Sequence, residues 1–304
     1  MKALLPAGGP GLVEFGDAGR PAPGPGEAVI RVEAFSVNRG ETFLLEQPPA
    51  GWRPGKDIAG LVVQGAADGS GPSTWTRVVA HPPAAGWAEY VAVATGSIAE
   101  LPSGITAVTA AALPLAGLTA LRMLRAAGDV AGRRILLTGA SGGVGHYFVE
   151  LAANAGAEVT AVSATPARGS RLTELGATSV LGTVTAAEGP FDLVLESVGG
   201  RVFPEALARL APGGTLIWFG QASREPVTLS FFDLLDRQPS ATIRHFSYAD
   251  PARFGADLAI LVRLVANGRL HPEIGRAADW ADTAATLADL RDRRIRGNAV
   301  LTVN

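Results

Sequence analysis

Glycines in the middle of the chain have the spacing of a phosphate-binding turn. Gly139, Gly142 and Gly145 recur at every third residue, after the apolar run Ile135–Thr138. Apolar residues at helical spacing then predict a helix over Val144–Ala155. Glycine permits a tight turn and lets backbone approach a pyrophosphate, and the first N–H groups of a helix attract anions. The pattern therefore predicts a dinucleotide site. The predicted contacts are Gly142, Gly143, Val144 and Gly145.

The residues after the next predicted strand indicate which dinucleotide binds. An enzyme that prefers NAD usually carries Asp or Glu there, to hold the ribose 2′-hydroxyl. Here the strand Glu158–Val162 is followed by Ser163, and then by Arg168 and Arg171, with no carboxylate. A hydroxyl and a guanidinium can both donate to a 2′-phosphate, so Ser163 and Arg168 predict NADPH. The alternatives are that both arginines are solvated helix surface, and that the glycine turn holds no ligand.

Length and composition exclude several classes of protein. The chain has 304 residues, enough for two domains, and its 47% hydrophobic and 18% charged residues exclude a disordered chain. It contains no cysteine, which excludes disulfides, thiolate nucleophiles and cysteine-containing zinc sites. The net charge of −2 gives no reason to expect nucleic acid or an anionic membrane as partner. The apolar stretch Ala107–Leu121 is shorter than the ~20 residues of a membrane span. We expect a soluble, cytoplasmic protein without a metal.

The pattern of elements changes near Thr106. Before it, short apolar runs between Gly and Pro predict a barrel-like β domain. After it, apolar strands alternate with helices, which predicts a doubly wound parallel sheet and an α/β fold. The other predicted strands are Ala28–Ala34, Ile58–Val63, Thr76–Ala80, Ala88–Val93, Ser179–Leu181, Leu193–Glu196, Thr215–Phe219 and Arg296–Val303, and the other helices are Arg168–Leu175, Phe203–Leu210 and Arg253–Asn267. The tail strand predicts a discontinuous first domain, residues 1–112 and 267–304, around a dinucleotide-binding domain of residues 113–266.

Short motifs along nearly the whole chain resemble the medium-chain dehydrogenase/reductase superfamily, in its zinc-free quinone oxidoreductase branch. They are AFSVNRGE (Ala34–Glu41), PGKDIAG (Pro54–Gly60), GWAEYVAV (Gly86–Val93), LPLAGLTAL (Leu113–Leu121), GASGGVG (Gly139–Gly145), ELGA (Glu174–Ala177), ESVGG (Glu196–Gly200) and GNAVLTV (Gly297–Val303). The resemblance implies a Rossmann domain, a GroES-like β-barrel-type domain, an NADPH-dependent oxidoreductase activity and a homodimer.

The chain departs from the zinc-dependent relatives at their ligand positions. By this resemblance, Asn38 stands where those enzymes have a cysteine ligand, and Lys56 and Asp57 stand where they have a His-Glu pair. A charged lysine is not a zinc ligand, and the missing cysteine removes the soft donor. The chain is therefore expected to work without zinc, which excludes alcohol oxidation that relies on zinc to acidify the alcohol.

Further cofactor contacts follow from strand ends and from the resemblance. Ser197 and Val198 come after a predicted strand, at the sheet edge where doubly wound folds bind ligands. The resemblance places the backbone of Phe219 and Gly220 near the nicotinamide amide. It also places Thr119 beside the nicotinamide and gives Asn298 a contact from the tail. The alternative for Thr119 is a helix-interior residue that bonds to its own backbone.

The sequence offers few groups that could act as catalytic acids or bases, which favours a substrate that is already electrophilic. Without a metal, and without a Ser-His or Tyr-Lys constellation, the chain can do little acid–base work, which suits a quinone or an α,β-unsaturated carbonyl compound. Catalysis would come from positioning this acceptor against the nicotinamide. Asn38 and Thr119 are the catalytic candidates. Asn38 would steer the carbonyl oxygen of the substrate; the alternative is that it fixes the turn before Gly40.

Two other functions remain open from the sequence. One is reduction of an enoyl thioester or of another biosynthetic intermediate. The other is an NADPH-binding regulatory or structural protein that has kept the fold, since a fold does not guarantee a function.

Overall fold

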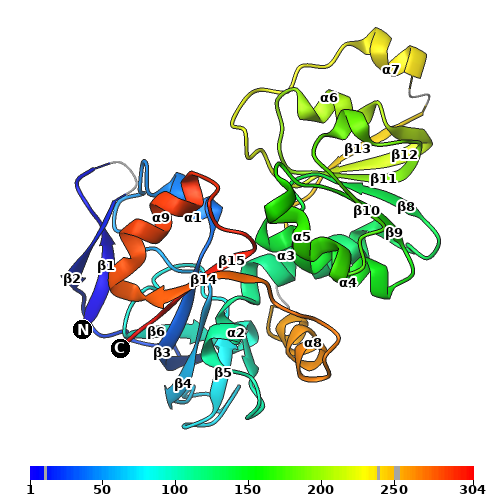
Figure 1. The fold of residues 1–304 in the computed structure, drawn as a ribbon. Helices are drawn as coiled ribbons and strands as arrows, with labels where there is room; N and C mark the ends of the chain where they lie inside the picture. The colour runs from blue at the N-terminus through cyan, green and yellow to red at the C-terminus, as the bar shows by residue number, and fades with distance from the viewer. Residues whose placement is uncertain (10–11, 238–239, 250–253) are drawn as a thin grey trace. The chain divides into compact units, whose positions relative to one another are not determined.

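Two large sheets of different kinds organise the chain, one in each of two units (Figure 1). This computed structural model describes residues 1–9, 12–237, 240–249 and 254–304. The first unit comprises Met1–Leu118 and Pro251–Asn304, and the second comprises Thr119–Asp250. Both chain ends therefore belong to the first unit.

The second unit is built on a six-stranded sheet whose neighbouring strands are all parallel. Its strands are β8 (Arg134–Leu137), β9 (Glu158–Val162), β10 (Ser179–Leu181), β11 (Phe191–Glu196), β12 (Leu210–Trp218) and β13 (Thr242–His245). They lie in the order β10-β9-β8-β11-β12-β13. The first strand in sequence, β8, thus lies between β9 and β11, which is the switch point where doubly wound sheets bind ligands.

Helices cover both faces of this parallel sheet, with α4 and α5 on one side and α6 on the other (Figure 1). The helical segments are α3 (Pro114–Ala127), α4 (Gly143–Asn154), α5 (Pro166–Glu174), η2 (Val184–Ala186), α6 (Val202–Leu207) and α7 (Phe231–Arg237). The start of α3, up to Leu118, still belongs to the first unit. Between the sheet and α6 lies a core that includes Leu136, Val194, Phe203 and Leu216. The central strands β8 and β11 are apolar in sequence because both of their faces are buried.

The first unit contains a seven-stranded sheet with the path β14-β15-β3-β4-β5-β7, and β6 also pairs with β3. All of these pairs are antiparallel except β14–β15. Its strands are β3 (Glu27–Val37), β4 (Ile58–Gln64), β5 (Arg77–Ala80), β6 (Tyr90–Ala94), β7 (Ile98–Glu100), β14 (Ile274–Asp279) and β15 (Asn298–Thr302), and β1 (Lys2–Pro6) and β2 (Val13–Asp17) form a separate pair. Because β15 pairs with β3, the C-terminal strand completes the sheet of the N-terminal segment.

Short helices surround this antiparallel sheet. They are α1 (Arg39–Leu44), η1 (Thr95–Ser97), α2 (Ala107–Ala111), α8 (Phe254–Ala266), η3 (Trp280–Asp282) and α9 (Thr283–Arg291). Helix α2 packs against β3 and β4, and α8 packs against β7. In the core of this unit, Phe35 and Trp87 stack with ring centroids 5.4 Å apart.

The predicted fold class is confirmed, since a doubly wound parallel sheet accompanies a largely antiparallel unit. The structure differs from the predicted elements at several points. Helix α6 ends at Leu207 and not at Leu210, because Leu210 pairs with Phe191 in the sheet. Strand β13 was not predicted, because all four of its residues are exposed and it lacks an apolar pattern. The predicted helix over 253–267 is α8, and Arg253 lies outside the described residues.

The division of the structure also differs from the predicted domain boundaries. Helix α8 was assigned to the dinucleotide-binding domain but belongs to the first unit. The reason is close packing, since a Cβ added at Gly255 would lie 2.6 Å from the carbonyl oxygen of Ile98. The exact domain boundaries stay a prediction.

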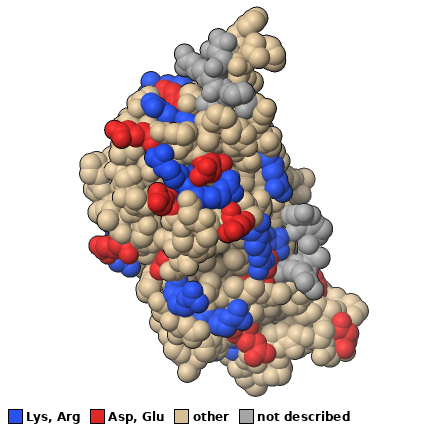
Figure 2. Space-filling model, turned by 90° about the vertical axis from the view of Figure 1, so that its right-hand side faces the viewer, with Lys and Arg blue, Asp and Glu red and all other residues tan. Residues whose placement is uncertain are grey.

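The surface of the described residues carries charged side chains of both signs and some large apolar side chains. Acidic and basic side chains are interspersed on the face that Figure 2 displays. Among the described residues, no helix is both long and apolar enough to cross a membrane. Large apolar side chains are exposed on α7, where Phe231 is 70% and Phe232 72% exposed, and Ile243 is exposed on the neighbouring edge strand β13.

Candidate functional site

The predicted glycine turn connects β8 to α4. Gly139 adopts a φ of +63°, a left-handed conformation that favours glycine. Gly145 is required by close packing, because a Cβ there would lie 2.2 Å from the carbonyl oxygen of Ala140. At Gly142 the nearest described atom to an added Cβ is the Gly139 carbonyl oxygen, at 3.4 Å. The turn is thus tight on its inner side and open at Gly142.

The open side of this turn carries backbone donors. Gly142 is the N-cap of α4, and the first helical hydrogen bond runs from the N–H of His146 to the Gly142 carbonyl oxygen. The N–H groups of Gly143, Val144 and Gly145 donate to no residue that the structure describes. Such groups, at the positive end of a helix of twelve residues, fit a pyrophosphate. The residues present therefore fit a dinucleotide.

A buried carboxylate shapes the loop after β11. Glu196, at the end of that strand, accepts hydrogen bonds from the N–H of Val198 at 2.7 Å and of Gly199 at 3.1 Å. The Thr138 hydroxyl lies 3.1 Å from Glu196 and accepts the N–H of Ser197. Burial raises the pKa of the Glu196 carboxyl, although these hydrogen bonds act to lower it. Glu196 thus ties together the ends of β8 and β11, the two strands at the switch point.

The residues predicted to contact the ribose lie together after β9. Ser163 is buried, and its hydroxyl donates to the carbonyl oxygen of Thr165 at 3.0 Å. Thr165 is the N-cap of α5, and its hydroxyl accepts the N–H of Arg168. Arg168 is partly buried in the first turn of that helix. A contact from Ser163 to a phosphate would therefore compete with its bond to Thr165.

Other predicted contacts belong to different parts of the structure. Phe219 and Gly220 follow β12, and the Phe219 N–H donates to the Glu196 carbonyl oxygen, so they adjoin the loop of Ser197 and Val198. Thr119 is buried on α3. Asn298 lies in the first unit, where its side chain donates to the carbonyl oxygen of Glu273 at 3.0 Å.

A second polar group of residues lies at one end of the antiparallel sheet. Phe35 pairs with Ile58, and Ile58 pairs with Ala80. One residue further along, this register places Ser36, Asp57 and His81 in a row across three neighbouring strands. All three side chains are buried.

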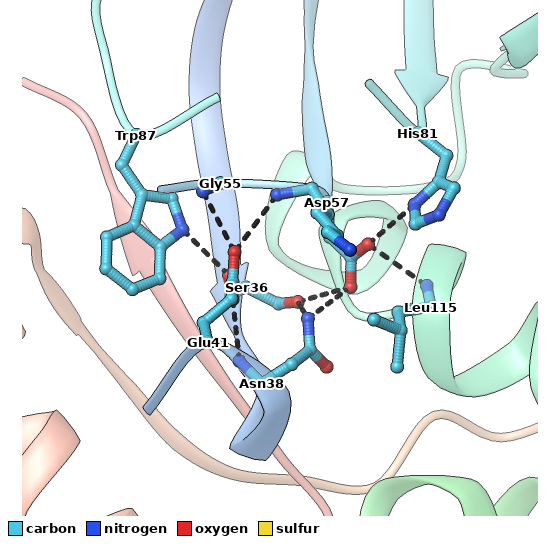
Figure 3. A network of polar contacts seen from close by, with 9 residues as sticks. Ser36, Asn38, Glu41, Gly55, Asp57, His81, Trp87 and Leu115 are labelled. Carbon is cyan, nitrogen blue, oxygen red and sulfur yellow. Dashed lines mark hydrogen bonds and ion pairs between the residues drawn. The ribbon is translucent and has the colours of Figure 1, made fainter. Parts of the chain in front are cut away.

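Asp57 is the centre of this polar cluster (Figure 3). Its Oδ1 lies 2.9 Å from Nδ1 of His81 and 3.0 Å from the backbone N of Leu115 in α3. Its Oδ2 accepts hydrogen bonds from the Ser36 hydroxyl and from Nδ2 of Asn38, each at 2.8 Å. Both carboxyl oxygens therefore act as acceptors, for four groups that come from three segments of the chain. Because a carboxyl oxygen accepts here, His81 carries its proton on Nδ1.

Glu41 organises the adjoining loop, next to the Asp57 cluster. One of its oxygens accepts the Asn38 N–H at 3.0 Å, and the other accepts the N–H groups of Gly55 at 2.9 Å and Lys56 at 3.2 Å. Burial, followed by the charge of nearby Asp57, raises the pKa of the Glu41 carboxyl from 4.5 to about 8. These bonds hold the segment that carries Lys56 and Asp57 against the start of α1.

Asn38 is thus placed inside a network, and apart from Asp57 its other side chains were not predicted from the sequence. Ser36, Glu41 and His81 were not singled out, and neither was Glu196 in the second unit. A signal was present, since Asp57 and His81 each adjoin an apolar strand segment and Ser36 lies within one. Their proximity depends on strand pairing, which the sequence pattern does not reveal.

Comparison with known proteins identifies a family model and relatives that this chain matches. The family model described as zinc-binding dehydrogenase matches residues 143–263. The chain is 32% identical over 301 residues to the spectinabilin polyketide synthase system protein NorB of Streptomyces orinoci. That match covers 92% of this chain, whereas the chain spans only 13% of the length of NorB.

The residues at the Asp57 cluster do not fit a catalytic zinc. Asn38 already donates its amide N–H groups to Asp57 and Ser36, and Lys56 has no lone pair while it is charged. Within the described residues, no three His, Cys, Asp or Glu side chains form a group able to hold a metal ion. The match to a family model named after zinc therefore does not place a zinc ion at these residues.

Two further relatives match over almost their full length. The quinone oxidoreductase of Pseudomonas aeruginosa is 29% identical, and the match covers 97% of this chain and 96% of that protein. The structure of mycobacterial Rv1454c complexed with NADPH is 27% identical, with a TM-score of 0.89, and the match covers 99% of this chain and 100% of the other. The chain belongs to the medium-chain dehydrogenase/reductase superfamily of oxidoreductases, in its quinone oxidoreductase branch.

Proposed function

We propose that the protein is an NADPH-dependent, zinc-independent reductase that transfers a hydride to a quinone or an α,β-unsaturated carbonyl compound. One observation carries the proposal: the glycine turn offers three N–H donors at the switch point of a parallel sheet. The similar mycobacterial structure, which binds NADPH, supports the choice of cofactor.

Preference for NADPH over NADH rests on the segment after β9. No carboxylate stands there to hold a 2′-hydroxyl and repel a 2′-phosphate. We assign the 2′-phosphate contact to Ser163 and Arg168, and the pyrophosphate contact to residues 142–145. The loops of Ser197–Val198 and Phe219–Gly220 would hold the nicotinamide half, with Thr119 beside it. A contact from Asn298 to the cofactor would compete with the bond that its side chain donates to the carbonyl oxygen of Glu273.

The chain's own contribution to the reaction is binding and orientation. Bound NADPH would supply the hydride that adds to the conjugated acceptor, while solvent supplies the proton. We assign activation of the acceptor to hydrogen bonding and to exclusion of water. Asn38, held by Asp57, is the proposed contact to the acceptor.

A second candidate is reduction of an enoyl thioester. The similarity to a protein of a polyketide synthase system favours it, because polyketide assembly works on thioesters. The two candidates share the hydride donor and differ in the group attached to the acceptor carbonyl.

Turnover assays test both candidates. NADPH consumption by the purified protein would be followed with a simple quinone, an ortho-quinone, an alkyl enone and an enoyl thioester, with NADH as the control cofactor. We expect turnover with a quinone or an enone, and a kcat/KM for NADPH about tenfold or more above that for NADH. Turnover of the thioester alone would replace the first candidate by the second. Absence of consumption with every acceptor would overturn both.

We also propose that the protein forms a homodimer through β13 and α7. Strand β13 is the exposed edge of the parallel sheet, and unpaired edge groups invite pairing with another strand. Two copies related by a two-fold axis can pair this edge with itself and cover Phe231 and Phe232. Light scattering should give twice the chain mass of 31.1 kDa, and Phe231→Ser with Phe232→Ser should shift the protein toward the monomer. A monomeric wild type would refute the dimer.

A further inference from the structure

The guanidinium of Arg53 carries a charge that the chain does not neutralise. Its Nη1 atom is fully buried and has no hydrogen-bond partner among the residues that the structure describes. Its Nε and Nη2 atoms are not buried in this way, and the side chain as a whole is partly exposed. A charged group that is partly removed from water without a partner is unfavourable. A ligand with a negative charge would supply the counter-ion.

The segment that carries Arg53 is bonded on two sides. The carbonyl oxygen of Arg53 accepts the N–H of Ala85 at 2.9 Å. Two residues further along, the N–H of Gly55 donates to the Glu41 carboxyl at 2.9 Å. The backbone position of Arg53 is therefore set before any ligand binds, which lowers the entropy cost of binding.

The Glu41 carboxyl connects this segment to Asn38, the residue proposed to contact the acceptor. One of its oxygens accepts the N–H of Asn38 at 3.0 Å, and the other accepts the N–H groups of Gly55 and Lys56 at 2.9 Å and 3.2 Å. Figure 3 shows Glu41 between Asn38 and Gly55. A substrate held at Asn38 therefore lies beside the segment that carries Arg53.

Lys56 adds a second positive charge to the same segment. Its side chain is partly buried, and its ammonium forms no hydrogen bond or ion pair with any residue that the structure describes. The neighbouring carboxyl of Asp57 accepts its hydrogen bonds from other groups. Burial raises the pKa of Glu41 to about 8, so this carboxyl is largely protonated at neutral pH. The segment thus presents two cations that have no contact with a carboxylate.

We propose that Arg53 and Lys56 bind an anionic group of the acceptor, a carboxylate or a phosphate, so that the enzyme prefers acceptors that carry such a group. This proposal rests on the proposed reductase function and names its substrate class more narrowly. The planar guanidinium can donate two parallel hydrogen bonds to the oxygens of either group, and the ammonium adds a second charge.

Matched acceptors test the proposal in the assay of the proposed function. They are alkyl enones that end in a carboxylate, in a phosphate, or in the neutral methyl ester of the carboxylate. Each is made at several chain lengths, because the anion must reach Arg53. At the best length we expect the wild-type kcat/KM to be about tenfold or more higher for an anionic compound than for the ester. The larger of the two anionic ratios distinguishes carboxylate from phosphate.

Substitutions of the two cations should remove this preference. In Arg53→Met the ratio of anionic to neutral acceptor should fall to near one, and Lys56→Met should lower it as well. Arg31→Gln is the matched control, because it removes one positive charge from an exposed side chain of the same unit, and it should leave the ratio unchanged. An equal fall in all three variants would show a general effect of charge and overturn the site.

Thermal stability separates a binding role of Arg53 from a structural one. The side chain forms no hydrogen bond with a described residue and keeps a charge partly buried, so Arg53→Met should hold or raise the melting temperature. A lower melting temperature with an unchanged substrate ratio would make Arg53 a structural residue and overturn the proposal. A loss of NADPH affinity with an unchanged ratio would assign Arg53 to a phosphate of the cofactor, which also overturns it.

Binding separates this proposal from the reductase function. Calorimetry with the NADP⁺-loaded protein would measure the affinity for the same compounds. If none is turned over but an anionic compound binds more tightly than the ester, and Arg53→Met removes this preference, the reductase function fails and the anion site stands. A wild type that reduces the compounds without preference and binds them equally keeps the reductase function and overturns the anion site, and this result does not depend on whether a variant folds.

Discussion

Nδ1 of His81 lies 2.9 Å from Oδ1 of Asp57, and both side chains are buried although they are 24 residues apart in the chain. The pair joins the start of β4 to the end of β5. Asp57 also bonds the first turn of α3 and the Asn38 amide, so one carboxyl group connects the antiparallel sheet to two helices.

Removing this carboxyl group should destabilise the protein. Asp57→Ala removes the acceptor of four hydrogen bonds, and buried polar groups that lose their partner cost about 1–3 kcal/mol each. We expect the free energy of unfolding to fall by about 3 kcal/mol or more, measured by urea denaturation. Asp17→Ala, at an exposed carboxyl on β2, is the control and should change it by less than about 0.5 kcal/mol. Equal effects of the two substitutions would contradict the central role of Asp57.

Glu41 should make stability depend on pH. Its folded-state pKa of about 8 lies above the ordinary 4.5, so the folded protein binds this proton more tightly than the unfolded chain. The stabilisation is fully present below about pH 4.5 and is lost as the pH rises through about 8. The loss should be on the order of a few kcal/mol.

Melting temperatures from pH 5 to pH 9 test this, with Glu41→Gln as the non-titrating comparison. The variant should be less stable than the wild type at the acidic end. The NH2 group of its side-chain amide would face a backbone N–H that an oxygen of Glu41 accepts in the wild type. The difference should shrink toward the alkaline end. Parallel curves would show that Glu41 does not titrate in this range.

Two glycines of the phosphate turn should respond differently to alanine. Gly145→Ala introduces a Cβ at 2.2 Å from the Ala140 carbonyl oxygen, so it should lower the melting temperature and distort the turn. Gly142→Ala meets nothing nearer than 3.4 Å, so it should fold normally. Its methyl group would nevertheless obstruct a pyrophosphate that approaches the backbone, and we expect NADPH affinity to fall about tenfold. Unchanged affinity in Gly142→Ala would argue against a phosphate site at this turn.

Arg168 and Arg171 form a matched pair for cofactor choice. Arg168→Gln should weaken NADPH by about tenfold or more and leave NADH unaffected, because only NADPH carries the 2′-phosphate. Arg171 pairs with Glu174 on the same helix, and Arg171→Gln should leave both affinities unchanged. Fluorescence titration of each variant with both cofactors measures the effect. A reversed outcome would assign the phosphate contact to Arg171.

Local patterns in the sequence were sufficient for the dinucleotide-binding unit. The glycines of the turn, the apolar strands on either side and the helical spacing after Val144 all lie within thirty residues. Such patterns report on the burial of neighbouring residues: the last three residues of β8 are buried, and in β9 buried residues alternate with more exposed ones. The same reasoning could not find β13, because an exposed edge strand leaves no apolar alternation.

The polar cluster around Asp57 was decided only by the tertiary structure. Ser36, Asp57 and His81 become neighbours because β3, β4 and β5 pair in one particular register, and Leu115 joins them from a helix. Sequence identified Asn38 as a candidate, yet the direction of its amide depends on which acceptors lie beside it. The sequence gives the chemical groups of each residue. Which of these groups faces a ligand depends on contacts between segments that are distant in the chain.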